Sequence, residues 1–195
     1  MKFDVVIIGG GLAGMTCATM LQQAGFNCAV VAKGKTLHRT DPAAYLRSGG
    51  VLFKSDAAVL GTFSSGKLLD IRTEKLGSTR LEADWFVLAT GKFASGGLSA
   101  DMGDVRETVF DAEVEYDPDR SRWADADFYA PQPFLSFGVK ADAEGRLTVG
   151  GGVVANLFGA GEILSGIDGT AEGAEEKIAQ SARKAAENII HGIKG

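Results

Sequence analysis

The sequence predicts an α/β fold in which helices cover a mainly parallel sheet that is interrupted by a β-meander. Residues 3–8 form a strand that is continuously apolar apart from Asp4 at its edge, as strands buried on both faces are, and it leads through a glycine-rich turn into a helix. Residues 57–75 alternate about a short polar turn, as the two arms of a hairpin do. Residues 154–190 return from an apolar strand to a long helix. This order of patterns is typical of α/β proteins with a parallel sheet.

The composition is that of an ordinary globular chain. Hydrophobic residues make up 45% of its 195 residues, which suffices for a buried core and suggests a single domain over residues 1–195. The formal charge is 20 − 25 = −5, which gives no support to a nucleic-acid partner. No apolar run reaches the roughly 18 residues that cross a bilayer, and the N-terminus enters a strand without a secretory signal. We therefore expect a cytoplasmic protein, free or held at a membrane by partner subunits.

The first 33 residues form a strand–turn–helix–strand unit. After the strand at 3–8, a helix is predicted over 12–23, and Gly25 is placed to end it. A second apolar strand covers 27–32. The glycine-rich turn therefore follows a strand and opens a helix, as the dinucleotide-binding turn of a Rossmann-type sheet does.

Gly9, Gly11 and Gly14 have the G-x-G-x-x-G spacing of a dinucleotide-binding turn. The first glycine allows a tight turn, the second lets the backbone approach a pyrophosphate, and the third lets helix and strand pack closely. The start of the helix, Leu12 and Ala13, then presents free N–H groups to the anion. We predict that these five residues bind a cofactor. The other interpretation is a glycine-rich turn in a nucleotide-free fold of the same type.

The second strand ends in Ala32-Lys33-Gly34, where dinucleotide sites usually have Asp or Glu to accept from a ribose hydroxyl. Lys33 cannot accept that bond, but it can donate to ribose or phosphate oxygens, and the backbone of Ala32 and Gly34 can supply other contacts. A basic residue here also fits the 2′-phosphate of NADP, which is an alternative. His38 follows and is predicted to line the flavin or a phosphate; the alternative is a solvated loop residue.

The β-meander is predicted over residues 51–82, with a hairpin turn at Ser64–Lys67. A second hairpin is predicted over residues 138–149, with its turn at Asp142–Gly145. We assign both a scaffolding role.

A strand end favours flavin over NAD. The apolar strand at 85–89 ends in Ala89-Thr90-Gly91, the A-T-G sequence with which flavoproteins of the two-dinucleotide-binding type re-enter the nucleotide domain after a β-excursion. These three residues are predicted to contact the cofactor.

A C-terminal return also favours flavin. A short strand, Leu157-Phe158, runs into Gly161 and Glu162, and a long helix follows over about 171–190. The strand end is predicted to lie along the flavin. The helix start, at Thr170 and Ala171, is predicted to face the flavin, because a helix dipole stabilises the negative charge of reduced flavin.

The chain offers no metal site and no catalytic side chain that we can name. Its two cysteines, Cys17 and Cys28, are too few for an iron–sulfur or zinc site and are predicted to be buried structural thiols. No nucleophile–base pair or carboxylate dyad is present, which fits an enzyme whose cofactor carries the chemistry. Electrons taken up by this chain would have to leave through another protein.

Three motifs between about residues 82 and 169 are specific: FVLATGKFASGGL, DFYAPQPFLSFGV and NLFGAGEILSGID. With the N-terminal FDVVIIGGGLAG and KGKTLH, they resemble the B subunit of the anaerobic, three-subunit glycerol-3-phosphate dehydrogenase. The resemblance implies a flavoprotein subunit that uses FAD, or FMN as an alternative. It would pass electrons from glycerol 3-phosphate toward quinone, through partner subunits that include an Fe–S carrier. A basic residue at the end of the second strand is normal in this family, so Lys33 is compatible with flavin.

The chain departs from that family in length. Members are about twice as long, and the difference falls where 17 residues separate Lys33 from Val51. Related flavoproteins begin a substrate-capping domain there, so we expect no full substrate domain. By analogy with succinate dehydrogenase, a covalent flavin link at His38 is a further alternative. The rival function is a non-catalytic flavin-binding or scaffold subunit of a complex.

Residues 101–127 carry ten acidic and three basic side chains, and aromatic residues and prolines follow at 128–134. The segment is interpreted as a solvated face, with a docking surface for partner subunits as the alternative.

Overall fold

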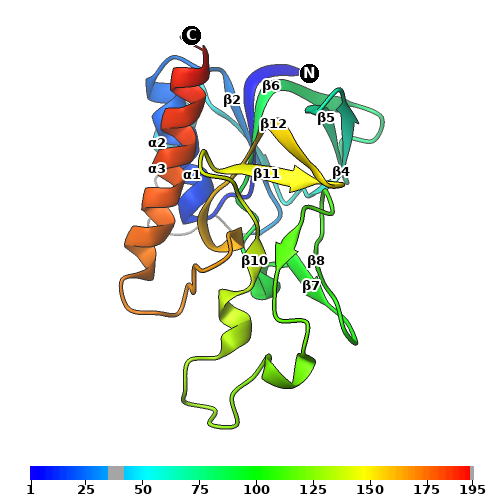
Figure 1. Ribbon diagram of the computed structural model, residues 1–195. Helices are drawn as coiled ribbons and strands as arrows, with labels where there is room; N and C mark the ends of the chain where they lie inside the picture. Colours follow the sequence, from blue (N-terminus) through cyan, green and yellow to red (C-terminus); the bar gives the residue numbers. More distant parts are fainter. Residues whose placement is uncertain (35–41, 194–195) are drawn as a thin grey trace.

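A computed structural model describes residues 1–34 and 42–193 (Figure 1). Its largest sheet has eight strands, and its main path follows the order β11-β12-β6-β1-β2-β3. Neighbours along this path are parallel, except that β11 is antiparallel to β12 at one edge. These strands are β1 (Lys2–Ile8), β2 (Cys28–Ala32), β3 (Val51–Lys54), β6 (Arg80–Leu88), β11 (Arg146–Val149) and β12 (Gly152–Gly159). The predicted α/β fold with a Rossmann-type parallel sheet is confirmed.

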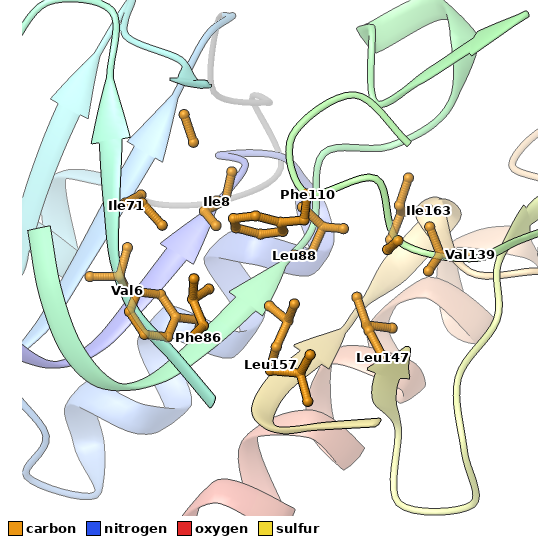
Figure 2. Packing of buried hydrophobic residues seen from close by; sticks show 14 of the residues in the cluster. Val6, Ile8, Ile71, Phe86, Leu88, Phe110, Val139, Leu147, Leu157 and Ile163 are labelled. Carbon is orange, nitrogen blue, oxygen red and sulfur yellow. The ribbon is translucent and has the colours of Figure 1, made fainter. Parts of the chain in front are cut away.

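Both faces of the sheet are covered. The helices α1 (Leu12–Gln23) and α3 (Ala174–Ile193) lie together on one face, where alternate residues of β1, such as Val5 and Ile7, are fully buried (Figure 1). Their neighbours Val6 and Ile8 point to the opposite face and join a second apolar cluster with residues of the meander (Figure 2). This two-sided burial explains why β1 is continuously apolar from Val5 to Ile8.

The hairpin at the centre of the predicted meander is confirmed. β4 (Ala58–Ser64) pairs antiparallel with β5 (Lys67–Thr73), and β5 pairs with the start of β6. The two turn residues, Ser65 and Gly66, have φ values of 51° and 73°, as a tight two-residue hairpin requires.

The predicted start of the meander, from residue 51, is wrong. The strand β3 lies parallel to β2 and belongs to the Rossmann-type sheet. The short helix α2 (Pro42–Arg47) provides the crossover, and its buried Tyr45 hydroxyl donates to the carbonyl oxygen of Cys28 at 2.7 Å. This side chain therefore holds the short connection against β2.

The predicted hairpin over 138–149 is present only as a single bridge between Ala141 and Leu147, around the expected turn. The strand β11 instead pairs antiparallel with β12, and Gly150 and Gly151 form the turn between the two strands. The strand β10 (Gly138–Val139) pairs with β9 (Val114–Glu115).

An excursion beyond the sheet links β6 to β10 and carries the 3-10 helix η1 (Phe93–Ser95) and the hairpin of β7 (Leu98–Ala100) and β8 (Val105–Glu107) (Figure 1). The 3-10 helices η2 (Arg120–Arg122) and η3 (Pro133–Ser136) follow. Edge-to-face contacts of Trp123 with Tyr116 and Phe137 fix this part to the body.

Candidate functional site

The glycine-rich turn brings three elements into contact. An ideal Cβ on Gly9, whose φ is 119°, would lie 2.1 Å from the carbonyl oxygen of Ala89, directly after β6. An ideal Cβ on Gly14 would lie 1.9 Å from the carbonyl oxygen of Gly9. Only glycine permits both approaches, so the ends of β1 and β6 and the start of α1 meet at this point.

The second glycine of the fingerprint has a different environment. No described atom lies within 4 Å of an ideal Cβ on Gly11. The first turn of α1, which begins at Leu12, has N–H groups without intrahelical partners, and these groups attract anions. The open side of the turn can therefore receive a phosphate group.

The A-T-G strand end lies beside this turn. An ideal Cβ on Gly97 would lie 1.9 Å from the carbonyl oxygen of Gly91 and 2.6 Å from the hydroxyl oxygen of Thr90. That hydroxyl oxygen is buried and has no hydrogen-bond partner among the described residues. A buried polar atom of this kind fits a site whose polar ligand supplies the missing partner.

The C-terminal turn completes the cluster with η4 (Gly161–Ile163). An ideal Cβ on Gly161 would lie 2.5 Å from Cβ of Ala13, and the Gly161 N–H donates to the hydroxyl of Ser181 in α3 at 2.8 Å. The Oε2 atom of Glu162 lies 3.7 Å from the ideal Cβ position of Gly91. Three turns far apart in the sequence, all of which we predicted as cofactor-binding, thus meet at the carboxyl ends of the central strands.

Lys33 reaches this region from the end of β2. Its Nζ atom lies 3.8 Å from the ideal Cβ position of Gly96, which follows η1. Because β1 lies between β2 and β6, the side chain extends across the carboxyl end of β1. Ala32 is buried and Gly34 is exposed at the same strand end, and His38 lies outside the described residues.

Thr170 and Ala171 do not form the start of α3, where we predicted them to face the flavin. The helix begins at Ala174 rather than near 171, and both Thr170 and Ala171 are exposed in the preceding turn. The N–H and hydroxyl of Thr170 donate to the carboxylate of Asp168, at 2.8 and 2.7 Å. The turn is therefore closed by a local Asp side chain, and the helix starts three residues later than its composition suggested.

A charged residue that the sequence analysis missed lies in the same place. Lys92 directly follows Gly91, and its side chain is 8% exposed. Its Nζ donates to the carbonyl oxygens of Leu135, at 2.5 Å, and Ile167, at 2.7 Å. Burial lowers the pKa of Lys92 to about 8, although the nearby carboxylates of Glu162 and Asp168 act to raise it.

Neither cysteine takes part in this site. Cys17 and Cys28 are free thiols that are fully buried between α1 and β2, and burial raises the pKa of Cys28 to about 12. The prediction of structural thiols is confirmed. Within residues 1–34 and 42–193, no group of three or more His, Cys, Asp or Glu side chains is arranged to hold a metal ion.

A family model described as an FAD binding domain matches residues 4–53 and 43–176. The chain belongs to this family of FAD-binding domains. The match spans the glycine-rich turn, the A-T-G strand end and the Gly161 turn, and it supports FAD as the cofactor rather than the NADP considered for Lys33.

Curated relatives of this FAD-binding domain include the B subunit of the anaerobic glycerol-3-phosphate dehydrogenase of Vibrio cholerae, which is 35% identical over 159 residues. The corresponding B subunit of Aliivibrio fischeri is 35% identical over 173 residues. These matches cover 80% and 82% of this chain and confirm the predicted resemblance. They cover 36% and 38% of the relatives, so the chain spans a little over a third of their length.

Solved structures share the fold. A thioredoxin reductase from Gloeobacter violaceus superposes on 99% of this chain and 95% of its own, with a TM-score of 0.61 and 14% identity. The flavin-dependent brominase Bmp2 covers 100% of this chain and 80% of its own, with a TM-score of 0.62 and 12% identity. The FAD-binding domain therefore shares its fold with these proteins.

Proposed function

We propose that this chain is a flavoprotein dehydrogenase subunit that binds FAD and passes electrons from glycerol 3-phosphate toward quinone. The observation that carries the proposal is the meeting of three glycine turns around an open, anion-attracting helix start, in a chain 35% identical to dehydrogenase B subunits. When bound, FAD would supply the two-electron acceptor for substrate oxidation. The protein would supply the position and the electrostatic field of the cofactor.

The residues proposed to hold FAD come from four places. The glycine turn would bind the pyrophosphate, the end of β2 would contact ribose or phosphate, and the two other strand ends would lie along the flavin. The set consists of Gly9, Gly11, Leu12, Ala13, Gly14, Ala32, Lys33, Gly34, His38, Ala89, Thr90, Gly91, Gly161 and Glu162, with Thr170 and Ala171 at the turn before α3. Of these, Gly11 and Thr90 have the environments that fit a bound ligand best. Gly11 faces open space, and the buried Thr90 hydroxyl has no hydrogen-bond partner among the described residues.

We propose that residues 1–195 form one flavin-binding unit without a full substrate domain. The two pieces of the family match overlap at residues 43–53, where the structure has α2 and β3. This supports the expectation that a substrate-capping part is reduced at this connection.

Partner subunits are part of the proposal. The relatives are named as B subunits of a dehydrogenase, and this chain has the two cysteines Cys17 and Cys28, both buried, so an Fe–S carrier would have to be another protein. Phe128 and Tyr129 are 85% and 92% exposed on the excursion, which suits a docking surface. No helix among the described residues is long and apolar enough to span a membrane. A cytoplasmic location, with membrane attachment through partners, fits these features.

The first test is the visible spectrum of the purified chain, followed by mass spectrometry of the released cofactor. We expect flavin absorption bands and the mass of FAD. Release of FMN would keep the flavoprotein assignment and change the cofactor. A colourless protein that binds neither flavin when titrated would contradict the proposal.

A second candidate function is a non-catalytic flavin-binding or scaffold subunit. The observation that favours it is the coverage, since the chain spans only 36% of its Vibrio cholerae relative. Bleaching of the bound flavin by glycerol 3-phosphate without oxygen would favour the dehydrogenase. A flavin that stays oxidised in the assembled complex would favour the scaffold.

A further inference from the structure

Lys92, directly after the A-T-G strand end, joins three segments of the chain with one ammonium group. It belongs to the segment after β6, and its two acceptors lie in η3 and in the loop before α3, at Leu135 and Ile167. The donor is separated from these acceptors by 43 and 75 residues in the sequence. The side chain therefore ties the segment after β6 to both of these segments, which are also joined to each other by the hydrogen bond from the Gly166 N–H to the carbonyl oxygen of Ser136 at 2.8 Å.

The charges around Lys92 give it a second role. The negative charges of Glu162 and Asp168 both favour the charged form of this ammonium. Among the described residues, these two carboxylates are the charged groups that do this. Glu162 lies close to Gly91, at the A-T-G strand end. FAD carries a negatively charged pyrophosphate, which two unneutralised carboxylates beside its site would repel.

We propose that Lys92 is a positioning residue for FAD: it holds the 161–168 turn against the strand end at Thr90 and neutralises Glu162 and Asp168, so that an anionic cofactor can bind. This inference rests on the proposed function, because it concerns the affinity of the chain for FAD. It adds a charged residue that lies outside the glycine turns and that acts on FAD only through its neighbours.

The first test compares Lys92→Met with the wild type by titrating FAD into apo-protein and following the quenching of flavin fluorescence. Methionine keeps the unbranched apolar stem and removes the charge and both hydrogen bonds. We expect Kd for FAD to rise at least tenfold. Lys75→Met, at an exposed lysine away from the site, is the matched control and should leave Kd unchanged.

A charge rescue separates electrostatics from loss of folding. In the double variant Lys92→Met/Asp168→Asn, the asparagine oxygen can still accept from Thr170 while one negative charge is removed. We expect the double variant to bind FAD more tightly than Lys92→Met alone. Equal affinity of Lys92→Met and wild type, or a double variant no better than the single one, would overturn the inference.

The pH dependence provides a test that needs no variant to fold. The pKa of Lys92 is lowered by burial to about 8, and an anionic ligand favours the charged form. FAD affinity of the wild type should therefore fall as the pH rises from 7 through about 9. The contribution of Lys92 to folding has the opposite sign: its folded-state pKa lies below the ordinary 10.5, so the unfolded chain binds more protons and stability rises over that range.

An FAD affinity that is constant from pH 7 to 9, together with a Lys92→Met protein that binds FAD as tightly as the wild type, would overturn the inference. If the wild type binds FAD and only these tests fail, the inference about Lys92 is wrong and the proposed function stands. If the wild type binds no flavin at any pH, the proposed function itself fails.

Discussion

At the scale of single residues, the glycine-rich turn between β1 and α1 contains two kinds of glycine. Gly14 faces inward, because its ideal Cβ would lie 1.9 Å from the carbonyl oxygen of Gly9. Gly11 faces outward, because its ideal Cβ would meet no described atom within 4 Å. The same substitution therefore tests folding at one position and ligand binding at the other.

We expect Gly11→Val to fold like the wild type and to lose at least 100-fold in FAD affinity, or about 2.7 kcal/mol. The added side chain would occupy the space through which a pyrophosphate approaches. Gly14→Val should fail to fold, since its Cβ would overlap backbone. Circular dichroism and FAD titration measure the two effects. A folded Gly11→Val protein with wild-type affinity would contradict the assignment of the turn.

The same scale shows what sequence could and could not predict of the site. Gly9, Gly11 and Gly14 follow a local spacing rule, so the turn was predictable without a structure. Lys92 was not, because its partners Leu135 and Ile167 are brought to it by tertiary structure. A lysine directly after A-T-G is the one local signal, and such a lysine is usually an exposed loop residue.

At the scale of elements, Asn156 fastens β12 to the meander. Its amide oxygen accepts from the Leu68 N–H at 2.8 Å, and its amide nitrogen donates to the carbonyl oxygens of Leu68 and Asp84, at 2.8 and 2.9 Å. The side chain is 5% exposed. The side chain thus bonds β12 to the backbone of Leu68 in β5, although the two strands are not paired with each other.

We expect Asn156→Ala to lower the free energy of unfolding by about 2–3 kcal/mol, because it leaves buried backbone groups without partners. Asn156→Asp should cost at least as much at pH 7, since a carboxylate cannot donate to the two carbonyl oxygens. Urea denaturation measures both. Asn188→Ala, at a half-buried asparagine whose amide donates to the carbonyl oxygen of Glu144 near the surface, is the control and should cost under about 1 kcal/mol. Equal losses at the two positions would contradict the role of Asn156.

Elements with a local pattern were predictable, whereas the pairing of two strands outside the Ser64–Lys67 hairpin was not. The helix over 12–23 and the hairpin at Ser64–Lys67 follow from spacing and turn residues, and both are confirmed. The pairing of β3 with β2 depends on contacts about 22 residues apart in sequence, and there the prediction was wrong. The prediction for β11 was also wrong, because β11 pairs with the strand that follows it, β12. For β11 a local signal existed: Gly150 and Gly151, with φ values of 59° and 81°, form a tight hairpin turn.

At the scale of the whole molecule, the fold supports a cofactor site better than a substrate site. The three glycine turns converge as in an FAD-binding sheet, whereas the connection between β2 and β3 has only α2 among its described elements. The turn region at 166–177 carries four acidic side chains and one lysine. An acidic surface of this kind would repel the phosphate of glycerol 3-phosphate.

We therefore expect the isolated chain to bind FAD but not to oxidise glycerol 3-phosphate at a useful rate. If, as proposed, these residues form no full substrate domain, water reaches the flavin and the substrate is poorly held. The test mixes the purified, flavin-loaded chain with glycerol 3-phosphate and an artificial electron acceptor. Chemically reduced flavin in the same protein should be reoxidised by that acceptor, which shows that the cofactor is accessible. Turnover at ordinary enzyme rates, on the order of 1–1000 per second, would mean that these residues already form a complete substrate site.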